Sequence, residues 1–121
     1  KIVEEVIEFL QLESIRHELV DGLPIGLKKR VELARALVAE PQMLILDEPM
    51  AGMGREETAQ VTELLASLTD RYTLGLIEHD MDFVKDIAHR VTVLHQGKLL
   101  AEGKMDEVQA NEKVIEVYLG H

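Results

Sequence analysis

The chain has 121 residues, of which 46% are hydrophobic, and it carries a formal net charge of −10. This length and composition suit one globular domain with a sizeable core and exclude a disordered chain. The absence of cysteine excludes disulfide frameworks and thiolate metal sites. The acidity argues against a nucleic-acid partner, and no apolar run reaches the roughly 18 residues of a membrane span.

Helical periodicity dominates the first third of the chain. Apolar residues recur at helical spacing over residues 1–12, and a second apolar stripe predicts a helix from about Leu27 to Ala39. Asp21-Gly22 and Pro24 interrupt the pattern between these two helices. Because the sequence opens at Lys1 already inside a helical pattern and without an initiator Met, we expect a fragment or an excised domain.

Strands and helices alternate through the middle of the chain. Met43 to Leu46 and Thr73 to Ile77 predict two strands, the first of them buried on both faces, and a helix from about Arg55 to Thr69 separates them. Asp80 is a plausible N-cap for the helix that follows the second strand. This order predicts an α/β fold with a mainly parallel sheet.

The last third of the chain predicts a hairpin and two short helices. Val91 to Leu94 and Lys98 to Ala101 flank Gln96-Gly97, a two-residue turn signal in which the glycine supplies positive φ. The two helices are expected at about residues 105–110 and 112–119.

The strand at Met43 ends in Asp47-Glu48-Pro49, which is the most informative stretch of the sequence. Acids at the carboxyl end of a parallel strand lie where open α/β sheets bind ligands. One acid could hold a divalent cation while its neighbour orients or deprotonates a water, which is the chemistry of nucleoside-triphosphate hydrolysis. Equally, both carboxylates could simply be hydrated where the strand emerges into solvent, and this segment alone leaves both readings open.

Four segments, in this order, resemble the C-terminal half of the ATP-binding subunit of an ABC transporter. They are Leu23-Pro24-Ile25-Gly26-Leu27 at the start of a helix, the Asp47-Glu48 strand end, the loop 49–54, and Glu78-His79-Asp80 after the next strand. In that family these positions are the signature loop, the Walker B strand, the D-loop and the switch histidine. The resemblance extends over nearly the whole chain.

The residues of these motifs are most similar to those of the uptake ATPases for branched-chain amino acids or urea. The likeness lies in the Leu-Pro-x-Gly signature, in Ala51-Gly52-Met53, and in the tail Val117-Tyr118-Leu119-Gly120. The signature departs from the commonest family form, because Pro24 stands where a serine often contributes a hydroxyl and an N–H to the γ-phosphate. Proline offers neither group, so this position cannot make that contact with the phosphate.

The resemblance implies a partial P-loop NTPase-like sheet flanked by helices, without its Walker A half. Residues 1–22 would end a helical subdomain, and residues 23–121 would form the C-terminal α/β part of the ATPase core. ATP and Mg²⁺ are the implied cofactors: Asp47 would hold Mg²⁺ through water, and Glu48 would be the catalytic base. His79, which in isolation is more often a satisfied structural histidine, would donate a hydrogen bond to the γ-phosphate.

The same resemblance implies two subunits in which the segment from Leu23 to Leu27 contacts the ATP of the opposite subunit. Integral-membrane permease subunits would be further partners, and the location would be cytoplasmic, on the inner face of the cell membrane. The complete subunit would power an importer for branched-chain amino acids or a related small polar solute. Two alternatives are a non-catalytic α/β interaction domain and a soluble ABC ATPase that is not coupled to transport.

No Gly-x-x-x-x-Gly-Lys-Ser/Thr phosphate loop occurs in the sequence. We therefore expect these 121 residues alone to bind ATP poorly and to be inactive, although the complete subunit would be an ATPase. In the family the phosphate-loop strand lies between the strand that ends at His79 and the strand at Val91 to Leu94. Its absence leaves an unpaired sheet edge, so we expect self-association, swapping or a shifted hairpin.

Overall fold

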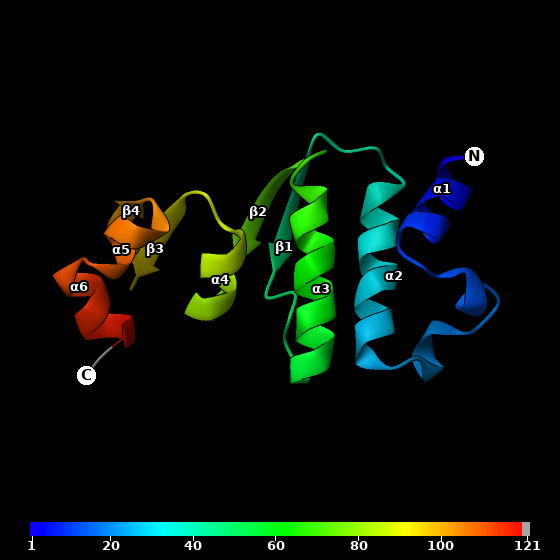
Figure 1. Ribbon diagram of the computed structural model, residues 1–121, viewed down its shortest axis with the longest axis horizontal. Coiled ribbons are helices and arrows are strands. Elements are labelled where there is room, and N and C mark those ends of the chain that lie inside the picture. The colour runs from blue at the N-terminus through cyan, green and yellow to red at the C-terminus, as the bar shows by residue number, and fades with distance from the viewer. Residues whose placement is uncertain (120–121) are drawn as a thin grey trace. The chain divides into compact units, whose positions relative to one another are not determined.

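The computed structural model describes residues 1–119, shown in Figure 1. Two compact units meet at the bond between His79 and Asp80. Gly120, which ends the predicted tail, and His121 lie outside the described residues. The division predicted after residue 22 stays a prediction.

The first unit contains three α-helices and two short 3₁₀ turns. These are α1 (Ile2–Phe9), η1 (Glu13–Ile15), η2 (Val20–Gly22), α2 (Ile25–Leu37) and α3 (Arg55–Leu68). The predicted helix at Leu27 begins two residues earlier, because the extended backbone of Pro24 serves as its N-cap. It ends where Glu40 turns into the left-handed region with φ of 53° and its N–H donates to the Leu37 carbonyl.

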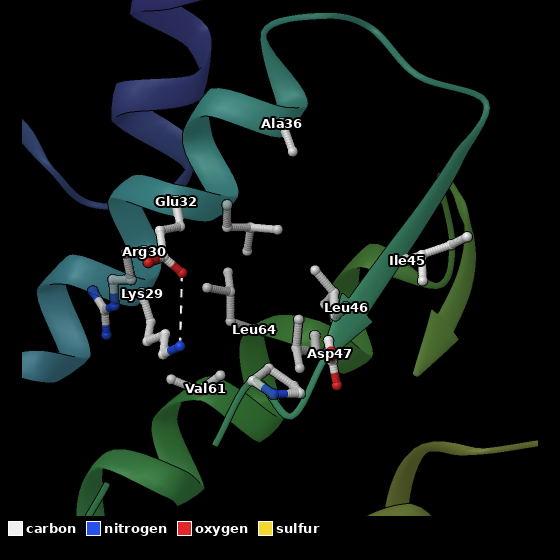
Figure 2. Close-up of a pocket in the computed structure, with 12 residues that line it drawn as sticks. Lys29, Arg30, Glu32, Ala36, Ile45, Leu46, Asp47, Val61 and Leu64 are labelled. Atoms are coloured by element: carbon white, nitrogen blue, oxygen red, sulfur yellow. Dashed lines mark ion pairs between the residues drawn. The ribbon is translucent and has the colours of Figure 1, made fainter. Parts of the chain in front are cut away.

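Two parallel strands complete the first unit, β1 (Met43–Asp47) and β2 (Thr73–Ile77), as predicted. Leu44, on one face of β1, is 4% exposed, whereas Met43 and Ile45 on the other face are 53% and 66% exposed. The expectation that β1 is buried on both faces is therefore wrong for the described chain. The helices α2 and α3 line a common pocket with β1, and Leu46, which shares the face of Leu44 in the strand alternation, lies in this pocket (Figure 2).

The second unit is a helix, a hairpin and a short helical tail. Its elements are α4 (Met81–Ile87), β3 (Val91–His95), β4 (Lys98–Gly103), α5 (Met105–Gln109), α6 (Glu112–Val114) and the π-helical turn η3 (Ile115–Leu119). One cluster of its core consists of Val93, Val108 and Val114. The helix predicted over 112–119 is thus one α-helical turn capped by Asn111, followed by a π-helical turn.

Local sequence signals in the second unit are confirmed. The Asp80 side chain accepts hydrogen bonds from the N–H groups of Asp82 and Phe83 at the start of α4. Gln96 and Gly97 have φ of 51° and 76°, the conformation of a type I′ hairpin turn between β3 and β4.

The strands form two separate two-stranded sheets within residues 1–119, with β1 parallel to β2 and β3 antiparallel to β4. The predicted α/β class is confirmed, but the parallel part of the sheet is only one pair of strands. No helix in the described part of the chain is long and apolar enough to cross a membrane.

Candidate active site

The carboxyl ends of β1 and β2 bring Glu48 and His79 together. The register pairs Asp47 with Ile77, so both strands end at the same level of the sheet. The Glu48 N–H donates to the Ile77 carbonyl oxygen at 2.8 Å, which ties the residue after β1 to the end of β2. The side chains then meet, with His79 Nδ1 lying 3.1 Å from Glu48 Oε1.

The backbone at Glu48 is in the left-handed region, with φ of 46°. This conformation costs a non-glycine residue about 1–2 kcal/mol. Strain of this kind persists where the surroundings fix the backbone, and it is concentrated at functional sites. Here the hydrogen bond to Ile77 fixes the backbone, and the turn directs the Glu48 carboxylate towards the imidazole.

The side chains of Glu48 and His79, and the residue Asp47 beside them, are open to solvent. The Glu48 side chain is 49% exposed, the His79 side chain is 75% exposed, and Asp47 is an exposed residue. Within residues 1–119 no group of three or more His, Cys, Asp or Glu residues is arranged to hold a metal ion. Asp47 and Glu48 thus offer one or two carboxylates to a cation, a donor set that suits Mg²⁺ accompanied by water and phosphate oxygens.

Glu78 is a feature of this site to which the sequence analysis assigned no role. Its side chain is only 4% exposed. Its Oε1 accepts a hydrogen bond from the His79 N–H at 3.1 Å and lies 3.6 Å from His79 Nδ1. Its Oε2 is buried and has no hydrogen-bond partner among the described residues. The sequence did contain one signal for its burial. Glu78 follows Leu74 and Leu76 at alternate positions, and such positions lie on the same face of a strand.

The predicted signature segment forms the start of α2. Leu23 is the C-cap of η2, Pro24 is the N-cap of α2, and α2 begins at Ile25. The first helical bond in α2 is donated by Lys28 to the Pro24 carbonyl, so the preceding N–H groups have no acceptor in the helix. No hydrogen bond or ion pair of the described chain joins this segment to Glu48 or His79.

Gly26 lies against the first turn of α3. A Cβ built on Gly26 would stand 3.4 Å from Glu57 Oε2, an oxygen that is buried without a partner in the described chain. Glu57 is therefore a second acid whose position beside a predicted site residue the sequence did not indicate. Its place behind the signature segment depends on the packing of α2 against α3, which no local pattern encodes.

A pocket of about 260 Å³ lies between α2, β1 and α3, as Figure 2 shows. Leu46 and Leu64 contribute apolar walls, and Asp47 lies at the end of β1 that borders the pocket. On α2, Lys29 and Glu32 form an ion pair at 3.7 Å. The acidic end of β1 is thus lined on the helix side by apolar groups and by the cations of α2.

Two families match this chain. Residues 1–51 match the family described as ABC transporter, and residues 98–121 match the family described as branched-chain amino acid ATP-binding cassette transporter. LivG of Salmonella typhimurium, a high-affinity branched-chain amino acid transport ATP-binding protein, is 44% identical over 101 residues, or 82% of this chain and 40% of LivG. This chain belongs to the ABC-transporter ATP-binding proteins of the branched-chain amino acid type.

Further relatives of this ABC-transporter chain agree. BraF of Pseudomonas aeruginosa, which has the same description as LivG, is 36% identical over 116 residues, covering 94% of this chain and 46% of BraF. A nucleotide-free ATP-binding cassette from an ABC transporter superimposes with a TM-score of 0.89 at 29% identity, covering 99% of this chain and 49% of that one. The chain therefore has part of the cassette fold, and it spans about half the length of these relatives.

Proposed function

We propose that this chain is the C-terminal part of an ATP-hydrolysing subunit that powers an ABC importer for branched-chain amino acids or a related small polar solute. The observation that carries the proposal is the 3.1 Å contact between Glu48 and His79, beside Asp47 at the ends of two parallel strands. The likeness to LivG and BraF, whose descriptions name branched-chain amino acid transport, supports the choice of solute.

In this proposal Asp47, Glu48 and His79 each have one role at the terminal phosphate of ATP. Asp47 would hold Mg²⁺ through water, and the ion would supply charge stabilisation for the transferring phosphoryl group. Glu48 orients or deprotonates the attacking water. His79, which the Glu48 carboxylate already contacts, donates a hydrogen bond to the γ-phosphate. The exposure of all three residues leaves this edge of the sheet accessible to a nucleotide.

The segment from Leu23 to Leu27 contacts the nucleotide of the opposite subunit in this proposal. The N–H groups at the start of α2 and the positive end of its dipole provide a phosphate contact, and Gly26 allows close backbone approach. Pro24 offers neither a hydroxyl nor an N–H, so the contact depends on the backbone from Ile25 onward.

The partners follow from the family to which the chain belongs. A second ATPase subunit would complete each site, and integral-membrane permease subunits would convert closure of the pair into transport at the cytoplasmic face of the membrane. Because these 121 residues contain no phosphate loop, the chain alone should hydrolyse almost no ATP. Turnover by the isolated chain equal to that of a complete transporter would contradict this.

The decisive experiment is the Glu48→Gln variant of the complete subunit. The amide keeps the size of the side chain but cannot accept the proton of the attacking water, so ATP should bind, hydrolysis should fall by roughly a hundredfold or more, and a closed ATP-loaded dimer should accumulate. Size-exclusion chromatography with ATP and an assay of released phosphate measure both effects. Wild-type turnover in this variant would remove Glu48 from its role, and a subunit that never binds ATP would favour a non-catalytic interaction domain.

A further inference from the structure

The buried side chain of Glu78 is the feature of the site that the proposed chemistry does not use. It continues the inward face of β2, where Leu74 and Leu76 precede it, and it is only 4% exposed. An apolar side chain at this position would suit the fold better, because a buried carboxylate oxygen without a hydrogen-bond partner costs free energy. Oε2 of Glu78 has no such partner among the described residues.

The contacts of the other oxygen point to His79. Oε1 of Glu78 accepts the backbone N–H of His79 at 3.1 Å and lies 3.6 Å from Nδ1 of the same ring. Glu48 Oε1 approaches that nitrogen from another element, at 3.1 Å. Two carboxylates from the ends of two neighbouring strands therefore face one ring nitrogen.

The chemistry of these groups fixes the position of the proton. An ionised carboxylate only accepts hydrogen bonds, so the nitrogen that faces Glu48 and Glu78 must be the one that carries a proton. The other ring nitrogen, Nε2, has no hydrogen-bond partner in the described part of the chain. Nε2 is thus the nitrogen left free to meet a phosphate, and the adjacent carboxylates balance the charge of a ring that donates from both nitrogens.

We propose that Glu78 is a positioning residue, which fixes the backbone of His79 and holds the proton on Nδ1 so that Nε2 faces the nucleotide. This inference rests on the proposed role of His79 and adds a residue that the proposed function does not contain. Glu78 does not touch the nucleotide in this scheme. It acts through His79, together with the carboxylate of Glu48.

Glu78→Met in the complete ATPase subunit is the main test. Methionine is flexible and apolar, so it fills the buried space and should leave the melting temperature unchanged or higher, but it cannot accept from His79. We expect kcat for ATP hydrolysis to fall roughly tenfold with KM within about twofold, because misplacing a reacting group costs rate more than binding. Glu78→Gln, whose carbonyl can take the place of Oε1, should restore most of the rate.

A spectroscopic measurement and a matched control separate positioning from a general effect on structure. In the ¹⁵N-histidine-labelled subunit with ATP bound, both ring nitrogens of His79 should carry a proton, because Nε2 can donate to the phosphate only while Nδ1 donates to the carboxylates. Glu78→Met should shift the Nδ1 resonance towards that of an unprotonated nitrogen. Glu63→Ala, an exposed acid on α3, should change neither signal nor rate. A Glu78→Met variant with wild-type kcat and an unchanged His79 resonance would overturn the inference.

A double mutant distinguishes this inference from the proposed function. If Glu78 acts through His79, Glu78→Met should not lower kcat further in a His79→Ala subunit. Equal and additive losses would overturn the positioning role. If His79→Ala alone keeps the wild-type kcat, the proposed function of His79 fails; if it lowers kcat while Glu78→Met does not, only the role of Glu78 fails.

Discussion

The left-handed backbone at Glu48 leads to a quantitative prediction about strain in the site. Glu48→Gly and Glu48→Ala both remove the contact with His79, so their difference in stability isolates the backbone at φ of 46°. Alanine retains the steric cost of about 1–2 kcal/mol, whereas glycine avoids it and instead loses about 0.5–1 kcal/mol of backbone entropy. The glycine variant should therefore be the more stable by about 1 kcal/mol.

Urea denaturation of the two variants measures this difference directly. For a chain of this size, about 1 kcal/mol corresponds to a shift of roughly 3–5 °C in melting temperature. Glu40 provides a matched control, because its backbone has φ of 53° and it lies outside the site. The Glu40→Gly variant should be more stable than the Glu40→Ala variant by a similar amount. If glycine and alanine at position 48 are equally stable while the pair at position 40 differs, Glu48 is not strained and the argument fails.

Three further predictions concern other parts of the chain. Asp80→Ala removes the N-cap of α4 and should lower the free energy of unfolding by about 1 kcal/mol in urea denaturation, and Asp80→Asn should restore it. The hydrogen bond and charge of Arg90 hold the pKa of Glu102 below its ordinary value, so the stabilisation by this exposed pair is present at neutral pH and is lost as the pH falls towards that lower pKa. Glu102→Gln should make the loss of stability at acid pH smaller. A variant whose stability depends on pH in the same way as the wild type would contradict the prediction. Ile45 is 66% exposed on a bare face of β1, so Ile45→Lys should reduce self-association of the chain. Analytical ultracentrifugation measures this change, and a wild-type chain that is monomeric at all concentrations would rule self-association out.

The elements of this protein could be predicted because their signals are local. Asp80 caps α4 through bonds to residues two and three positions away, and Gln96-Gly97 closes a hairpin within four residues. The periodicity of α2 and α3 records which side of each helix is apolar. Such signals depend on near neighbours in the chain, so they survive in a sequence that spans only about half the length of its relatives.

The placement of Glu48 beside His79 could be expected only through the family resemblance and the rule that parallel strands end together. The sequence separates these two residues by 31 positions, and their contact requires the register of β1 with β2. Their catalytic roles remain predictions, as do those of Asp47 and the signature segment.

The sequence alone determined the order of the main helices and strands, because local hydrogen bonding and the periodicity of apolar residues depend on near neighbours in the chain. Only the tertiary structure decided that Glu78 is buried against His79, that Glu57 lies behind Gly26, and that one face of β1 is bare. Burial depends on which distant segments cover a side chain, and that information is shared among residues far apart in the sequence.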